Sequence, residues 1–351
     1  MRVFVSLLVL IISFSSCYRD TSTSRCAYEE HFDFENDCRD VEQSIIINGT
    51  ISAQVFEGTE RYCPEFNPQS ENEIAFVLVD RTENPSKSSV ELVFADLRTG
   101  EHRFGHKLRD INTLYWNDEY IMLGGVLDDV YHIKTKTIQF VYKNIGFIMS
   151  GSSWHSKAGQ DYIYGWLDNE DWNPDLDAKI KGAQMVRVKY PSLEVERVPF
   201  FDNLTNHYTD LAISQNGQFV YDNTEEIMIY NESSNNSEVL FQSKVSIGNG
   251  GKCYDWHPNN KDVYFISDGI FYFKKGENKQ VRIKKSCPSR KYEWLTVSPT
   301  GDKIVASRRD IKARANGTYI SENTKLVIMD IDGCNEKVLF EDWDGTVIGR
   351  P

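Results

Sequence analysis

The sequence predicts an all-β protein, a six-bladed β-propeller whose blades are four-stranded antiparallel sheets. Three observations support this prediction. A short motif recurs six times, successive copies lie 38 to 59 residues apart, and no segment of ten or more residues has helical periodicity. A repeat of about 40 to 50 residues is typical of propeller blades.

Each copy of the motif contains a large or β-branched residue, a turn rich in Pro, Asn and Gly, and a short strand. The segments beginning at Tyr254 and Leu295 align without a gap, as Tyr-Asp-Trp-His-Pro-Asn-Asn-Lys-Asp-Val and Leu-Thr-Val-Ser-Pro-Thr-Gly-Asp-Lys-Ile. The residues at the equivalent position of the six copies are Phe66, Trp116, Trp154, Ile213, Trp256 and Val297. Large residues at one fixed position indicate packing between blades, so we interpret the three tryptophans as core residues.

A second hairpin follows the motif in several predicted blades. Strands at 90–96, 227–230, 270–274 and 325–330 lead into turns whose Gly, Asn and Asp residues tolerate positive φ. Radial packing of such sheets covers their faces and leaves only short outer edges. We expect the segment 44–56 to pair with the sixth blade, and the tail 346–348 to pair with the first.

The last two repeats resemble a known family. Val297-Ser-Pro-Thr-Gly-Asp-Lys and the later Lys325-Leu-Val-Ile-Met-Asp-Ile-Asp-Gly are similar to the TolB-type propeller repeat, Ser-Pro-Asp-Gly-Lys followed by a strand and Asp-Gly. The resemblance extends over about 62–342 and is weakest in the second and third repeats. It implies the six-bladed fold but little about function, because propellers have many unrelated functions.

The N-terminus has the pattern of an export signal. Met1-Arg2 precedes an apolar run at 3–14 that is too short to span a membrane. Ser15-Ser16-Cys17 resembles a lipobox, with Phe14 departing from the usual Leu, and implies lipidation of Cys17. The alternative is ordinary signal cleavage and a secreted protein. We therefore expect a signal peptide at 1–16, a tether and N-terminal segment at 17–43, and one propeller domain at 44–351. The expected location is a Gram-negative-type envelope, in the periplasm or at the outer membrane.

Charge and cysteine content restrict the partners and the redox environment. The net charge of −13 argues against nucleic acid, so the only expected membrane contact is the lipid anchor. Six cysteines remain besides Cys17, and an even number in an exported chain is typical of disulfides. Cys253 and Cys287 stand before the first strands of consecutive blades and are the favoured pair. Cys26 and Cys38 would then close a local loop.

Motifs for catalysis are mostly missing from the sequence. No Gly-x-Ser-x-Gly elbow and no HExxH motif occurs. We interpret His155 and His257, at equivalent positions after two of the tryptophans, as structural. Dispersed histidines leave a metal-dependent polysaccharide lyase or hydrolase, with its site at the channel mouth, as the alternative to a binding module. No cofactor is expected beyond a weak calcium-loop pattern that lacks the sixth-position Gly, formed by Asp171, Asn173, Asp175 and Asp177.

The favoured function is binding of an envelope protein or a polysaccharide by one face of the ring. Two charged insertions, the acidic one around 171–177 and the basic one at 308–321, are predicted on the face where the chain passes between blades. The predicted ligand-face residues mix aromatic groups with both charge signs and are Tyr62, Arg109, Asp110, Trp172, His207, Asp210, Lys252, Tyr254, Arg290 and Tyr292. Charge reversal at Arg290 and Lys252 is expected to weaken binding with little loss of stability.

Overall fold

The computed structural model describes residues 55–56, 59–80, 89–108, 111, 113–124, 129–146, 149–157, 159–167, 185–203, 211–222, 226–242, 254–267, 269–274, 279–286, 290–313, 319–341 and 346–349. The predicted signal peptide, the tether and most of the segment 44–56 lie outside these residues.

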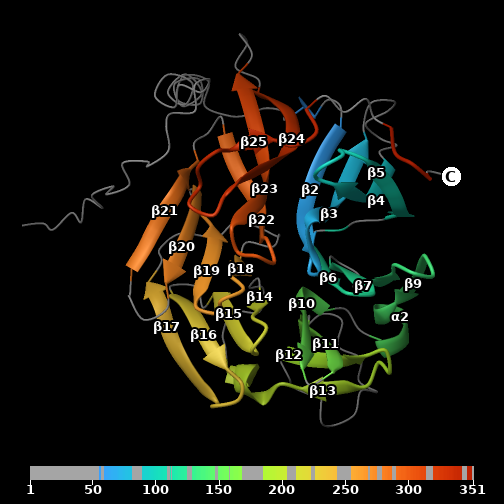
Figure 1. The fold of residues 1–351 in the computed structure, drawn as a ribbon. Helices are drawn as coiled ribbons and strands as arrows, with labels where there is room; N and C mark the ends of the chain where they lie inside the picture. Colours follow the sequence, from blue (N-terminus) through green and yellow to red (C-terminus); the bar gives the residue numbers. More distant parts are fainter. Residues whose placement is uncertain are drawn as a thin grey trace, which may run out of the picture.

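Six β-sheets lie around a ring, and each contains four consecutive strands (Figure 1). Blade 1 contains β2 (Thr59–Asn67), β3 (Ser70–Asp80), β4 (Ser89–Asp96) and β5 (His102–Lys107). Blade 2 contains β6 (Thr113–Asn117), β7 (Tyr120–Gly124), β8 (Asp129–His132) and β9 (Thr137–Phe140). Blade 3 contains β10 (Met149–Lys157), β11 (Gln160–Leu167), β12 (Met185–Tyr190) and β13 (Val195–Arg197).

Blade 4 contains β14 (Leu211–Ile213), β15 (Gln218–Asp222), β16 (Glu226–Asn231) and β17 (Asn236–Gln242). Blade 5 contains β18 (Tyr254–Trp256), β19 (Asp262–Ile266), β20 (Gly269–Lys274) and β21 (Lys279–Lys285). Blade 6 contains β22 (Arg290–Val297), β23 (Lys303–Ala313), β24 (Tyr319–Asp330) and β25 (Lys337–Val338). The described residues also form two short helices, α2 (Val141–Ile145) and the 3-10 helix η2 (Pro199–Asn203). The predicted fold class is confirmed.

The motif residues identified in the sequence all lie on the first strand of a blade. Side chains buried between neighbouring blades form the core as six clusters, one at each blade interface of the described residues. Trp116, Trp154 and Trp256 each belong to one of these clusters. The indole N–H of Trp256 also donates to the carbonyl oxygen of Ala212 in blade 4, at 3.2 Å. The tryptophans therefore have the packing role that their fixed position predicts.

The two ends of the described chain close the ring reciprocally. β1 (Val55–Phe56) pairs in parallel with β24 of blade 6, as Val55 with Ile320 and Phe56 with Ser321. Near the C-terminus Ile348 forms a parallel bridge with Arg103 of blade 1, through two 2.8 Å backbone hydrogen bonds. The expected pairing of the tail with the first blade is confirmed. The expected pairing of 44–56 with the sixth blade is confirmed for 55–56, the described end of that segment.

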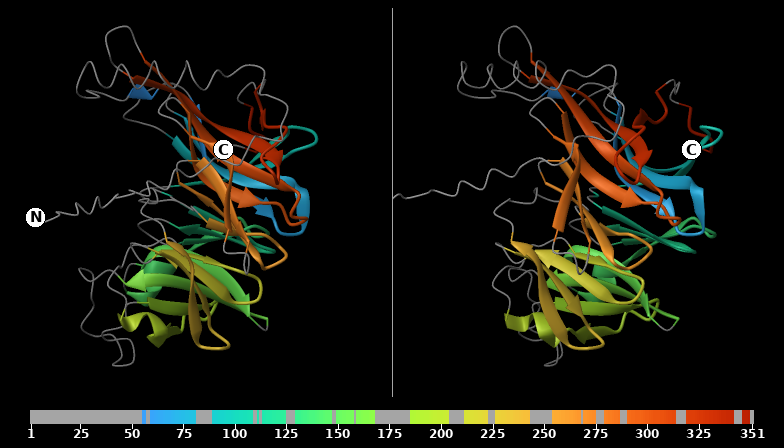
Figure 2. Two further views of the ribbon diagram at one scale, coloured as in Figure 1. Left: turned by 90° about the vertical axis from the view of Figure 1, so that its left-hand side faces the viewer. Right: turned by 60° about the vertical axis from the view of Figure 1, so that its left-hand side comes forward.

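The segment 308–321 is not the loop insertion that the sequence analysis expected. β23 and β24 run through it as a long hairpin, and only 314–318 separates the two strands. In Figure 2 these strands extend beyond the neighbouring sheets. The error arose because polar residues interrupt the apolar alternation at Arg308, although backbone pairing continues. The other insertion, around 171–177, lies outside the described residues.

The strand directions define two faces of the ring. Among β2 to β25, strands that are neighbours in the same blade run antiparallel to each other. The turns between first and second strands, and between third and fourth strands, therefore lie on one face, which we call the turn face. The connections between second and third strands and between blades lie on the opposite face, which we call the connection face.

Candidate ligand face

Four of the predicted ligand-face residues lie within the described chain, all on first strands of blades. Tyr62 lies on β2, Tyr254 on β18, and Arg290 and Tyr292 on β22. The other predicted residues lie outside the described residues, namely Arg109, Asp110, Trp172, His207, Asp210 and Lys252.

Three of these four side chains are buried. Tyr254 is 1% exposed, Tyr292 3% and Arg290 7%. Tyr62 is half-buried, and its ring packs edge-on against Trp294 at a centroid distance of 5.3 Å. The expectation that Arg290 can be reversed in charge at little cost in stability is therefore wrong, because a buried charge without its partner is destabilising.

A buried carboxylate, Glu336, connects blades 5 and 6. Lys284 of β21 lies 2.9 Å from Glu336 Oε2, and the hydroxyl of Tyr292 donates to the same oxygen at 2.7 Å. Arg308 forms an ion pair with the other oxygen. Burial alone would raise the pKa of Glu336, but the neighbouring charges of Lys284 and Arg308 outweigh it and lower the pKa to about 2.

Asp310 extends this network towards the connection face. Its carboxylate lies 3.0 Å from Arg308, 3.6 Å from Arg290 and 3.8 Å from Lys325. Four basic side chains thus share two acidic ones. We call these residues, with Tyr292, the blade-6 charge cluster: Lys284, Arg290, Tyr292, Arg308, Asp310, Lys325 and Glu336.

Further lysines lie around the cluster. Lys285 ends β21 and Lys291 is the second residue of β22, and both are exposed. Neither forms an ion pair with the described residues. The side chain of Lys325 is 32% exposed. We call Lys285, Lys291 and Lys325 the basic rim. The basic rim was not predicted from the sequence, although 279–291 contains six Lys or Arg residues and no acidic one.

The opposite side of β22 faces blade 1 and carries a second ion pair. Arg309 lies 2.7 Å from Glu293. Burial and the nearby charge of Glu60 raise the pKa of Glu293, while Arg309 opposes the shift. The register shift between Tyr292 and Trp294 turns Trp294 towards Tyr62 of blade 1. On this side an ion pair within blade 6 thus lies beside an aromatic contact with blade 1.

On the turn face, polar groups bond to one another between five of the six pairs of neighbouring blades. Side chains bond at Gln69–Asp118, Asn117–Asp161, Lys157–Glu232 and Thr300–Glu71, over 2.7 to 3.2 Å. His257 Nε2 bonds to the Gly301 carbonyl oxygen at 3.0 Å. This face thus uses many of its polar groups internally.

His155 and His257 have the structural role predicted from their repeat position. Each ring packs against the turn glycine of the next blade, Gly217 for His155 and Gly301 for His257. His155 is 6% exposed, and burial lowers its pKa. No group of three or more His, Cys, Asp or Glu side chains suited to a metal occurs among the residues that the structure describes. The weak calcium-loop residues lie outside them.

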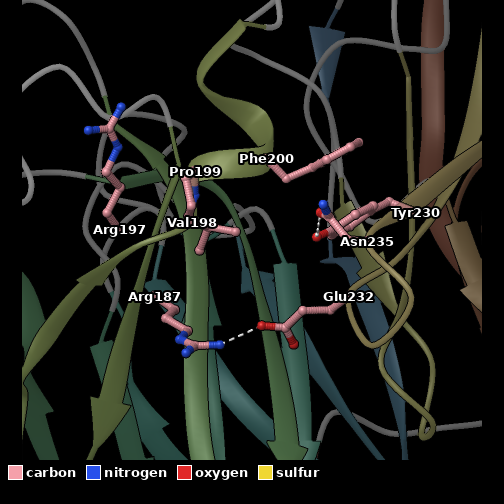
Figure 3. A pocket seen from close by; sticks show the side chains of 8 residues that line it. All are labelled: Arg187, Arg197, Val198, Pro199, Phe200, Tyr230, Glu232 and Asn235. Carbon is pink, nitrogen blue, oxygen red and sulfur yellow. Dashed lines mark hydrogen bonds and ion pairs between the residues drawn. The ribbon is translucent and has the colours of Figure 1, made fainter.

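Residues that line a pocket between blades 3 and 4 contact one another (Figure 3). Arg187 forms 2.6 Å ion pairs with both Glu196 and Glu232. The rings of Phe200 and Tyr230 stack at 3.6 Å. Since these contacts join the two blades, we interpret the pocket as part of their interface.

The described cysteines are Cys63 and Cys334. Cys63 is buried. Cys334 is disulfide-bonded to a cysteine outside the described residues. The predicted pairs Cys253–Cys287 and Cys26–Cys38 also lie outside them. Within the described part of the chain, no helix is long and apolar enough to span a bilayer.

No family model matches the chain, and no curated protein matches it. The fold is similar to the β-propeller domain of the Trilobed protease from Pyrococcus furiosus, at 14% identity over 83% of this chain and 86% of that one, with a TM-score of 0.42. It is also similar to an oligogalacturonate lyase in complex with manganese, at 12% identity over 80% and 77%, with a TM-score of 0.45.

A third similar structure is a prolyl endopeptidase, at 10% identity over 87% of this chain, with a TM-score of 0.40. The chain spans 47% of that endopeptidase chain, about half its length. These neighbours are propeller proteins, and at such identities they support no argument about function.

Proposed function

We propose that this chain is an exported lipoprotein, anchored by Cys17, that binds a protein partner or an extracellular polymer through its connection face. The difference between the two faces carries the proposal. Turn-face polar groups bond to one another between blades. The connection face bears the three longest segments between strands, 168–184 between β11 and β12, 198–210 between β13 and β14, and 243–253 between β17 and β18. Loops on a rigid scaffold are the usual binding elements.

The charge distribution favours an acidic ligand. The whole chain has a net charge of −13, yet the basic rim and the blade-6 charge cluster concentrate positive charge at the connection face. Local charge of one sign attracts ligands of the opposite sign and orients them. An acidic polysaccharide or an acidic protein surface fits this arrangement.

The test compares the two faces in cells that express the full chain. A photo-reactive amino acid in place of Lys291, on the basic rim, is expected to give covalent adducts with the partner. The same residue in place of Lys261, an exposed lysine in a turn-face loop of blade 5, is the matched control and is expected to give none. Adducts at Lys261 alone, or at neither position, would contradict the proposal.

The alternative function is a metal-dependent polysaccharide lyase or hydrolase. It requires histidines and carboxylates that converge within about 5 Å at the channel mouth. No observation on the described residues favours it over binding.

A further inference from the structure

We propose that the acidic segment 29–42 of the same chain docks on the basic rim of blades 5 and 6. The contact lies within one molecule and does not depend on the proposed function. If both hold, the segment covers part of the face that binds the ligand, and a ligand must compete with it.

The surface of the basic rim carries two lysines, Lys285 and Lys291, without a close ion pair to the described residues. Asp310 and Glu336 are engaged with the buried bases of the blade-6 charge cluster, and Glu293 pairs with Arg309. The exposed Lys285 and Lys291 form no ion pair with the described residues. The rim therefore keeps a positive charge that an acidic segment can neutralise.

The segment has the complementary charge. Residues 29–42 contain a single basic residue besides His31, namely Arg39, and the acidic residues Glu29, Glu30, Asp33, Glu35, Asp37, Asp40 and Glu42. Opposite charges attract over a screening length of about 8 to 10 Å at physiological salt. Phe32 and Phe34, between the acidic residues, can add apolar contact once the segment is held there.

The path of the chain brings the segment to this surface. The linker joins Val55, which pairs with Ile320 on β24, and Lys325 lies five residues further along the same strand, or about 17 Å at the usual rise. A chain as long as 43–54 has a root-mean-square end-to-end distance of about 20 Å when it has no fixed structure. The segment is therefore tethered beside the rim at an effective concentration of about 1 mM, so weak pairwise attraction suffices for docking.

Zero-length carbodiimide cross-linking of the purified exported protein tests the proposal, because the reagent joins a carboxylate to an amine only in direct contact. Peptide mapping is expected to find residues of 29–42 joined to Lys285 or Lys291 in material of monomer mass. The cross-links should disappear at about 1 M salt, where the screening length is about 3 Å. Cross-links to the turn-face Lys157 or Lys261 instead, or only in dimers, would overturn the proposal.

A second measurement does not require the lysines as reactants. Amide hydrogen exchange of 29–42 is expected to be about tenfold faster in the double variant Lys285→Glu/Lys291→Glu than in the unmodified protein. Lys261→Glu, the same charge change on the turn face, is expected to leave it unchanged. Equal exchange in the double variant and the unmodified protein would overturn the proposal even if both variants fold normally. Adducts at Lys291 in the photo-cross-linking experiment report on the partner separately, so the two proposals can fail independently.

Discussion

The hydroxyl group of Tyr292 donates a hydrogen bond to Oε2 of Glu336 at 2.7 Å, which joins the first strand of blade 6 to the turn before its last strand. Because Lys284 of blade 5 approaches the same oxygen, one buried carboxylate also connects two blades. A buried charge in such a position is costly to leave without its partners.

Glu336→Gln is expected to lower the free energy of unfolding by about 3 kcal/mol at neutral pH, the equivalent of the pKa change from its ordinary value of 4.5 to about 2. Because the folded-state pKa is lowered, this stabilisation is present above about pH 4.5 and is lost as the pH falls towards 2. The variant should therefore show a flatter loss of stability in that range, as measured by denaturant unfolding at several pH values.

Glu341→Gln is the matched control, since Glu341 is exposed. It should leave both the stability and its pH dependence unchanged. If the free energy of unfolding falls equally between about pH 4.5 and 2 in the Glu336→Gln variant and the unmodified protein, this carboxylate does not link folding to pH.

Two turn glycines separate the cost of a positive φ from that of a steric collision. Gly100 (φ +72°) and Gly301 (φ +77°) adopt similar conformations, but a Cβ at Gly100 would meet nothing within 4 Å, whereas a Cβ at Gly301 would lie 2.4 Å from the His257 ring. Gly100→Ala should cost about 1–2 kcal/mol, and Gly301→Ala more. In a double-mutant cycle, His257→Ala should recover the difference. Equal costs for the two glycine variants would contradict this explanation.

The disulfide partner of Cys334 can be predicted from its surroundings. The neighbouring residue Gly333 packs against Ile283, since a Cβ on Gly333 would lie 2.6 Å from the Ile283 carbonyl oxygen. Cys287 lies four residues after Ile283 in the sequence. We expect non-reducing peptide mapping to join Cys334 to Cys287, in place of the Cys253–Cys287 pair expected from the sequence. A peptide that contains Cys253 and Cys287 would restore the earlier pairing.

Cys17→Ala is expected to abolish membrane association while the propeller stays folded, because the proposed acyl chain would be the principal anchor. Fractionation of labelled cells measures this, with Cys63→Ala as a control for loss of a cysteine elsewhere. A Cys17→Ala protein that still sediments with membranes would show that the anchor lies elsewhere.

The fold could be predicted from the sequence because a repeat carries the same signal six times. The copy of the motif at Ile213 is weak by itself. Its spacing from Trp154 and Trp256 identifies it as a repeat. Ring closure by the two ends was also predictable, since the segments around β1 and Ile348 lie outside the six repeats. Such segments can pair only with a blade at the other end of the chain.

The surroundings of the charged residues could not be predicted in this way. Arg290 and Tyr292 stand at the start of a first strand, which suggested exposure, but neighbouring strands supply the groups that bury them. Those groups, Arg308 and Glu336, are distant in sequence and belong to no motif. Pairing between charges depends on register and on bulges such as that near Tyr292, which the residue pattern does not specify.

The pairing of Val55 and Phe56 with β24 determines where tension on the N-terminus would reach the ring. An anchored protein pulled at that end would load two residue pairs of a parallel ladder before any strand of blade 1. These few bonds would yield first and release slack from the chain before β2, while the extensive pairing of β2 with β3 still held. The short strand β1 would therefore detach at a lower force than the strands of the blades. The ring would stay folded at forces that separate β1 from β24.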